Sequence, residues 1–348
     1  MAKKKSTRYS GIGGQAVLEG VMMKNKDRYA VAVRKPDGEI AIEVENCKND
    51  GNKVKELPFI RGVFNFVDSM VLGMKALNYS ASFYDEEDAK ANDKAKKESN
   101  EQLTTMLVTL LSIAMAVGLF IVLPYLLSAF MGKFIRNDSL LAIVEGCIRI
   151  LIFLLYVWGI SAMQDIKRLY CYHGAEHKCI NCIEKGRPLT VHNVMRSSRL
   201  HKRCGTSFIF FVLIVSIILF FFIRVDNILL KVCLRILLMP VVAGISYELI
   251  RLAGRNDNVI VKILSAPGML IQRITTKEPD KAMVEVAIAA VEAVFDWKAY
   301  LKEAFGYEVD DSWLVDGSEE DEEFEATEDE SDETDVEYDE NVADVEES

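Results

Sequence analysis

Residues 103–131 read LTTMLVTLLSIAMAVGLFIVLPYLLSAFM, and this stretch decides the fold class of the 348-residue chain. It holds no charged side chain over 29 positions, whereas about 20 predominantly apolar residues are enough for a helix to cross the hydrocarbon core of a bilayer. The stretch therefore predicts a transmembrane helix. Pro124 lies inside it and predicts a bend, because proline cannot complete the hydrogen-bond pattern of a regular helix.

Three further apolar stretches follow along the chain. They cover residues 140–163, 208–223 and 228–252. Residues 205–207 extend the second of these at its start. The sequence therefore predicts four transmembrane helices. Glu145 and Arg149 lie four positions apart near the start of the second span, on one face of the helix. They can neutralise each other, so we expect this pair to have a structural role.

Charge is distributed unevenly along the chain. Of the 52 Asp and Glu, 22 lie after residue 307, where there is no Lys or Arg, so residues 1–307 carry about +11 and the tail is acidic. The connection between the second and third spans, residues 165–204, carries nine Lys or Arg against three acids. The positive-inside rule then predicts a protein of the cell membrane with this connection and both termini in the cytoplasm. In that reducing compartment its cysteines are expected to be thiols or metal ligands.

The N-terminal region predicts a small β-containing unit. Alternating β-branched runs at 29–34 and 40–44 flank the turn residues 36–38, a pattern typical of a β-hairpin. The preceding stretch GIGGQAVLEGVMM, residues 11–23, is rich in glycine and is interpreted as a tight turn packed against the body. Glu19 within it is expected to be salt-bridged or exposed.

The remaining segments are less regular. Residues 58–84 are apolar but carry three charges, which predicts a helix in the membrane interface or packed under the hairpin. Residues 259–274, broken by a Pro-Gly pair, are expected to re-enter the membrane or lie on its surface. Residues 279–305 have the apolar spacing of an amphipathic helix, and the tail from 308 is expected to be disordered.

The predicted fold class is mainly α: a polytopic α-helical membrane protein with four transmembrane helices and a small β-containing N-terminal cytoplasmic unit. Seven segments result. They are the hairpin unit 1–57, the interfacial helix and charged lead-in 58–102, spans one and two 103–164, a cytoplasmic His/Cys loop 165–204, spans three and four 205–253, C-terminal cytoplasmic or interfacial helices 254–307, and the acidic tail 308–348.

Chemistry concentrates in residues 170–207, YCYHGAEHKCINCIEKGRPLTVHNVMRSSRLHKRCGTS, which hold all four histidines and four of the seven cysteines. On a helix, His173 and His177 share one face, and Glu176 lies beside them in the H-x-x-E-H order of inverted zinc peptidases. Two imidazoles leave room for a further ligand and water, and a carboxylate can take a proton from that water. This predicts an open metal site with His201 or Cys204 as third ligand and Glu176 as general base or acid.

Two other interpretations compete with the open site. Cys179 and Cys182, followed by His201 and Cys204, have the paired spacing of a closed structural zinc site, which would hold the loop together and do no chemistry. In the other, no metal binds, the histidines and cysteines pack, and the basic residues contact lipid headgroups. His192 is expected to have no special role.

Three motifs carry a resemblance to a known family. GIGGQAVLEGVMMK at 11–24, YHGAEHK at 172–178 and SSRLHKRCGTSF at 197–208 resemble the YqhQ-like family of uncharacterised bacterial membrane proteins, over roughly residues 10–275. The family is catalogued as predicted metal-dependent enzymes. The resemblance implies a site drawn from five residues, with Glu19 in the N-terminal motif, and does not require Cys179 and Cys182. The five are His173, Glu176, His177, His201 and Cys204.

The resulting functional hypothesis is a metal-dependent hydrolase that acts on a peptide or lipid at the membrane surface and uses a divalent metal, most simply zinc. The alternative is a non-catalytic membrane scaffold or assembly factor whose His/Cys loop is structural and whose basic surface binds a protein partner. Membrane lipid is an expected partner in both cases, and nothing indicates a nucleic acid. Convergence of the histidine rings on a third ligand beside an open position would favour the enzyme.

Overall fold

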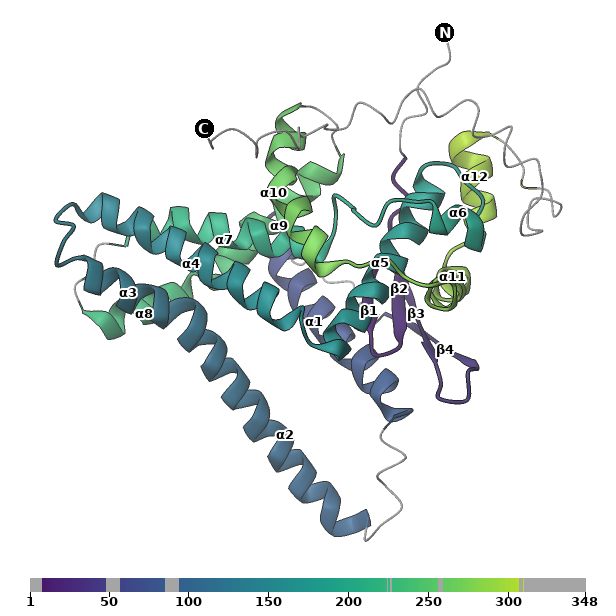
Figure 1. Ribbon diagram of the computed structural model, residues 1–348, viewed down its shortest axis with the longest axis horizontal. Helices are drawn as coiled ribbons and strands as arrows, with labels where there is room; N and C mark the ends of the chain where they lie inside the picture. Colours follow the sequence, from purple (N-terminus) through teal and green to yellow (C-terminus); the bar gives the residue numbers. More distant parts are fainter. Residues whose placement is uncertain are drawn as a thin grey trace, which may run out of the picture.

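A computed structural model describes residues 8–47, 57–84, 94–223, 225, 227–255, 259–306 and 309. The chain is mainly helical, with one antiparallel sheet at its N-terminal end. Figure 1 shows the long apolar helices on one side of the molecule and the sheet with its covering helices on the other. This arrangement matches the predicted separation of a helical membrane part from a small β-containing part.

The sheet has four strands in the order β1-β2-β3-β4. The predicted hairpin is confirmed as β3 (Arg28–Arg34) paired with β4 (Ile40–Asn46). The interpretation of residues 11–23 as a tight turn is wrong, because they form β1 (Ile12–Val17) and most of β2 (Gly20–Asn25). Packing on both faces of the sheet outweighs the weak strand preference of glycine here.

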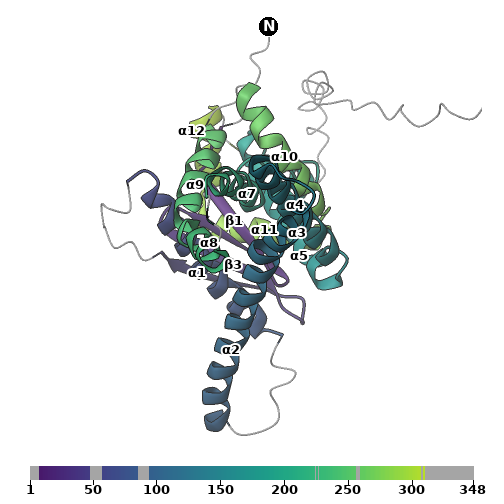
Figure 2. The ribbon, with the colours of Figure 1, turned by 90° about the vertical axis from the view of Figure 1, so that its left-hand side faces the viewer.

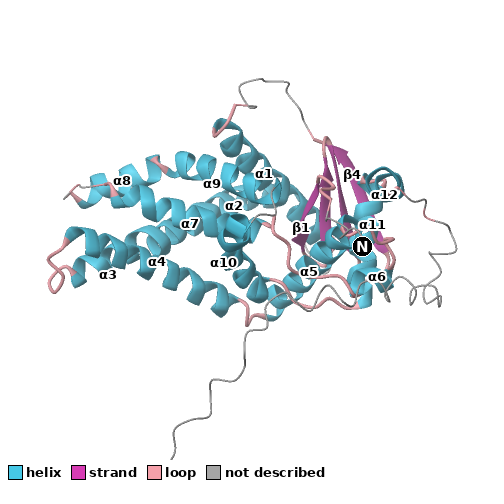
Figure 3. Ribbon diagram, turned by 90° about the horizontal axis from the view of Figure 1, so that it is seen from above, coloured by secondary structure: helices cyan, strands magenta, loops and turns pink. Residues whose placement is uncertain are grey.

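Each face of the sheet is covered by helices, as the view from above shows (Figure 3). One face packs on α1 (Ile60–Ser82), whose Ala76 lies against Val31 and Val33 in one buried cluster. The other face packs on α5 (Gln164–Glu184) and α11 (Lys281–Val294) in the largest core of the described residues. Helix α1 therefore lies under the sheet, one of its two predicted positions.

Three helical stretches are long and apolar enough to cross a membrane: Met106–Met131, Ser139–Ile160 and Leu229–Leu252. The fourth predicted span corresponds to α7 (Gly205–Phe221), an apolar helix of 17 residues that is shorter than the other three. The spans belong to the helices α2 (Lys94–Val117), η3 (Gly118–Val122), α3 (Leu123–Met131), α4 (Asp138–Ile160), α8 (Ile228–Leu237) and α9 (Met239–Arg255).

The first span is interrupted by η3, a single π-helical turn directly before Pro124. A proline ring clashes with the carbonyl four residues earlier, here that of Phe120 within the π turn, and the wider turn relieves that clash. The two views in Figures 1 and 2 both show α2 projecting away from the other helices.

A buried ion cluster joins two of the spans. Glu145 of α4 accepts from Arg149 and from Arg235 of α8, both at 2.9 Å, and its Oε1 also lies 2.7 Å from Arg235 Nη1 as an ion pair. The predicted structural pair is therefore present, and Arg235 is a third member that spacing along one helix does not indicate. Two guanidinium groups share one carboxylate, and both also lie over the Phe220 ring of α7.

The C-terminal region folds back onto the rest of the chain. Helix α10 (Val259–Thr275) contains Pro267 and packs on α7. The predicted amphipathic helix 279–305 is two helices, α11 and α12 (Trp297–Phe305), because Phe295 adopts extended backbone between them. The predicted disordered tail lies outside the described residues, apart from residue 309.

Candidate functional site

Helix α5 carries the H-x-x-E-H motif, so the predicted helical spacing holds. The His173 and His177 rings lie side by side, with centroids 4.4 Å apart. Gly174 follows His173, and a Cβ at this position would lie 2.0 Å from the carbonyl oxygen of Lys277. Glycine therefore allows the chain segment between α10 and α11 to cross α5 directly beside the histidines.

Cys204 completes a group of three. It is the N-cap of α7, where its sulfur accepts from the Thr206 N–H at 3.4 Å, and it lies 3.1 Å from His173 Nε2. The candidate ligand atoms of His173, His177 and Cys204 all lie within 4.8 Å of one another. Within the described part of the chain, this is the one group of three or more His, Cys, Asp or Glu side chains with the spacing of a metal site.

Both histidines are oriented by backbone carbonyl groups. The Nδ1–H of His173 donates to the Thr275 oxygen at 2.9 Å, and that of His177 donates to the Arg199 oxygen at 2.6 Å. A carbonyl oxygen only accepts, so each Nδ1 carries a proton, and Nε2 is the atom that holds the lone pair when the ring is neutral. Burial also lowers the pKa of His177, which favours the neutral ring.

Glu176 is buried and packs on strand β1. The Gly14 N–H donates to its carboxylate, and burial raises the pKa of Glu176 to about 7. A Cβ at Gly14 would lie 3.0 Å from Glu176 Cγ and 2.6 Å from the Met22 oxygen, so glycine makes this close approach possible. Glu176 is not one of the three clustered residues, but it faces the same cavity.

His201, the other predicted third ligand, has a different set of partners. Its ring nitrogen Nε2 lies 3.5 Å from the buried carboxylate of Glu184, and its backbone is held by Gln272 at 2.9 and 2.8 Å. Its ring centroid is 5.6 Å from that of His177. His201 therefore borders the site, and Cys204 is the candidate that lies with the two histidines.

Buried polar side chains of α5 hold the segment that leads to Cys204. Lys178 Nζ donates to the Met195 and Ser197 oxygens, both at 2.8 Å, and Asn181 donates to the Ser198 and Leu200 oxygens. The basic residues between the two motifs, 179–200, suggest an excursion on the surface that is not part of the site, but α5 supplies hydrogen bonds that fix the backbone at residues 195, 197, 198 and 200. Lys178 lies inside the motif YHGAEHK, and its place in the sequence does not indicate that it holds the backbone before Cys204.

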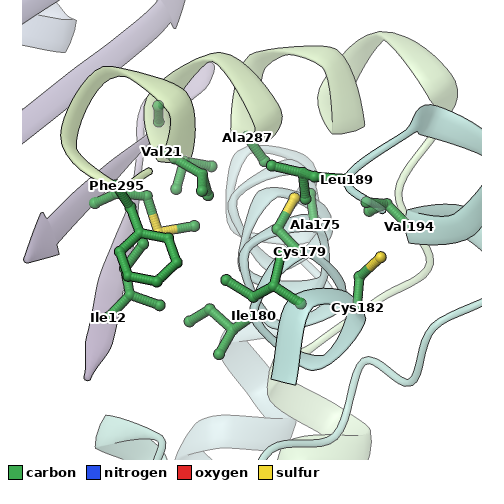
Figure 4. Close-up of a cluster of buried hydrophobic side chains, with 14 of the residues drawn as sticks. Ile12, Val21, Ala175, Cys179, Ile180, Cys182, Leu189, Val194, Ala287 and Phe295 are labelled. Atoms are coloured by element: carbon green, nitrogen blue, oxygen red, sulfur yellow. The ribbon is translucent and has the colours of Figure 1, made fainter. Parts of the chain in front are cut away.

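The two remaining cysteines of the motif lie elsewhere. Figure 4 shows Cys179 and Cys182 directed into the hydrophobic core between α5, α11 and the short helix α6 (Val191–Met195). Burial raises the pKa of Cys182 to about 12, so its thiol stays protonated. Neither thiol joins Cys204, which removes the closed four-ligand arrangement from the described structure.

Two further predicted residues have clear positions. Glu19 accepts from Arg168 and from the Tyr172 hydroxyl, so its expected salt bridge is confirmed. It stabilises the turn between β1 and β2 against α5. His192 of α6 interacts at 3.2 Å with Arg196, the C-cap of that helix, away from the clustered ligands.

A cavity of about 710 Å³ opens onto the cluster. Its lining includes His173, Glu176, His177 and Cys204. Residues 11–16, the glycine-rich start of the sheet, also line it. The clustered side chains therefore border a space of the size that small-molecule sites have.

The family described as "Protein of unknown function (DUF1385)" matches residues 57–297. The chain belongs to this family. The match begins at residue 57, later than the predicted start near residue 10, and it extends past the predicted limit at residue 275 to include α11, which packs on α5 and the sheet.

One relative has a curated description. The chain is 37% identical over 284 residues to "Uncharacterized protein YqhQ" of Bacillus subtilis (strain 168), covering 79% of this chain and 89% of that protein. The predicted YqhQ-like membership is thus confirmed. No solved structure matches the chain.

Proposed function

We propose that this protein is a metal-dependent hydrolase that works at the membrane surface, with a divalent ion held by His173, His177 and Cys204. The observation that carries the proposal is the orientation of both histidines by backbone carbonyls, which leaves two Nε2 atoms beside one sulfur. Metal-bound histidines regularly donate their other ring N–H in this way. Two imidazoles and a thiolate suit zinc best among the common ions.

The arrangement also fits catalysis better than a closed structural site. Three protein ligands would leave a coordination position open, which is the mark of catalytic zinc sites, and the three side chains line the cavity. A bound ion supplies Lewis acidity that activates water and polarises a carbonyl group. In hydrolysis the water oxygen bonds to the acyl carbon, the bond to the leaving atom breaks, and a proton passes to that atom. Glu176 faces the cavity and serves as the carrier of that proton.

The proposed topology has four spans, with α7 as the fourth and the site on the cytoplasmic side. The 17 residues of α7 measure about 26 Å at 1.5 Å per residue, a few Å less than a hydrocarbon core of about 30 Å, and bilayers accommodate such a mismatch. Labelling of intact cells with an impermeant maleimide tests this, in a background with Cys147 and Cys233 changed to Ser. Arg136→Cys should react and Lys185→Cys should not. The reverse pattern would reject the topology.

Metal analysis tests the site itself. The full chain is purified in detergent without chelators as wild type and as His173→Ala, Cys204→Ser and Glu176→Gln variants, with His192→Ala as the matched control. Wild type, Glu176→Gln and His192→Ala should retain stoichiometric metal, and the other two should lose it. Loading with cobalt(II) adds a thiolate charge-transfer absorption that Cys204→Ser should remove. Wild type without bound metal would refute the proposal.

One observation favours a second candidate, a cysteine hydrolase. Cys204 lies 3.1 Å from His173 Nε2 at the N-terminus of a 17-residue helix, and the ring is oriented by Thr275. A neighbouring base and a helix N-terminus both promote a thiolate nucleophile. Treatment with a chelator separates the candidates, because it would inactivate the metal enzyme and leave a cysteine enzyme sensitive only to alkylation.

A further inference from the structure

Strand β1 is one edge of the sheet. Val17 pairs with Gly20 across a two-residue turn, so alternate residues from Val17 back to Gly13 direct their N–H and C=O groups toward β2. Ile12, Gly14 and Ala16 lie between them and direct theirs away from the sheet. The backbone of β1 thus presents a row of polar groups on its open side.

The hydrogen bonds of these residues agree with that geometry. The Ile12 N–H donates to Ser10 Oγ at 3.3 Å, and the Gly14 N–H donates to Glu176. Both partners lie outside the sheet. The same open side receives the carbonyl groups of Ile12, Gly14 and Ala16 and the N–H of Ala16. A further strand would therefore meet three acceptors and one donor.

The two edges of the sheet differ in their protection. Exposed edges are usually blunted by charged residues, proline or bulges. The outer strand β4 carries Glu43 and Glu45, whereas β1 reads IGGQAV and has neither a charge nor a proline. Gly13 and Gly14 are exposed, and a Cβ at Gly13 would meet no atom within 4 Å. The β1 edge is therefore accessible to another backbone.

The cavity follows this edge around both sides of the strand. Ser69 and Leu72 of α1 line it on one side, and His173 and Glu176 of α5 line it on the other. Lys24 and Lys26 add positive charge to the same lining. A chain that pairs with β1 would run past the His173, His177 and Cys204 cluster.

We propose that β1 binds an extended polypeptide as a fifth strand of the sheet, and that the substrate of the proposed hydrolase is therefore a peptide bond. Addition of a strand to an exposed edge recognises backbone groups in a largely sequence-independent way. The lysines favour acidic side chains in the bound segment. The substrate assignment rests on the proposed function, whereas the docking does not. In the reaction, the water oxygen bonds to the carbonyl carbon, the C–N bond breaks and the new amine takes a proton.

Peptide binding tests the docking on the full chain in nanodiscs. The probe is a fluorescent ten-residue peptide of alternating valine and glutamate, and the readout is anisotropy. Ala16→Pro removes the outward N–H and should weaken binding about tenfold, since a proline ring also obstructs the approaching strand. Gly13→Ala is the matched control, because its backbone groups face β2, and it should bind as wild type does.

A second probe keeps the test decisive if Ala16→Pro fails to fold. The same peptide with every backbone nitrogen methylated cannot pair with a strand, and it should not bind to the wild type. Equal binding of both peptides, or no binding of the unmethylated peptide, would overturn the proposal. Wild type stripped of metal with a chelator should bind the unmethylated peptide normally, so a failed metal site is distinguishable from a failed docking edge.

Discussion

Gly174 gives the most direct test of how the site is held together. A methyl group at this position would lie 2.0 Å from the Lys277 oxygen, which is a backbone atom and cannot rotate away. A tolerable contact requires that the segment after α10 retreat by about 1 Å. The Thr275 carbonyl, two residues earlier, holds His173 Nδ1 at 2.9 Å. A retreat of that size takes the pair beyond hydrogen-bond distance.

Gly174→Ala should therefore weaken metal binding while leaving all three ligands in place. Loss of such an orienting hydrogen bond typically costs about 10–100-fold in metal affinity, and the overpacking should lower the free energy of unfolding by about 1–3 kcal/mol. Metal affinity is measured by competition with a chromogenic chelator, and stability by thermal unfolding in detergent.

Gly159→Ala is the matched control, since a Cβ at this helical glycine meets no atom within 4 Å. It should leave metal affinity unchanged and raise stability slightly, because alanine is the better helix former. If Gly174→Ala bound metal as tightly as the wild type and unfolded at the same temperature, the proposed link between the crossing segment and His173 would be refuted.

Three further predictions concern packing and buried charge. Gly14→Ala should lower the unfolding temperature, because its Cβ would lie 2.6 Å from the Met22 oxygen. Gly13→Ala should leave the unfolding temperature unchanged. Equal unfolding temperatures of the two variants would count against the packing described for β1. Glu145→Gln should lower the free energy of unfolding by about 3–5 kcal/mol, because two buried guanidinium groups lose their carboxylate. Arg235→Met should lower it by less, because Glu145 and Arg149 remain as a one-to-one pair. The opposite order of the two variants in chemical unfolding would refute this. Lys178→Met should leave the Met195 and Ser197 carbonyls without their donor and speed proteolysis between α6 and α7, which gel analysis would detect.

Much of the architecture is readable from local pattern. Hydropathy identified the long apolar helices, since burial in a bilayer requires continuous apolar sequence. The alternation at 29–34 and 40–44 identified the hairpin β3–β4. The spacing of His173 and His177 placed both rings on one helix face, because helical period is a local property. These inferences needed no knowledge of the rest of the chain.

The prediction of a turn where β1 lies was wrong because of the glycines in that stretch. Glycine disfavours strands when it is considered alone, so the run at 11–14 suggested a turn. In the fold, Gly14 is needed because Glu176 packs where a side chain would otherwise lie. The strand is stabilised by helices whose sequences lie far along the chain. Local preference could not reveal that requirement.

The composition of the site was decided by tertiary structure. The sequence supplied the candidates His173, Glu176, His177, His201 and Cys204, and it left the third ligand open between the last two. The turn into α7 brings Cys204 beside His173, and Gln272 and Glu184 hold His201 aside. Which side chains can act as metal ligands follows from residue type and can be read from the sequence. Which donors converge depends on contacts between residues about 30 to 100 positions apart, and only the packed fold determines those.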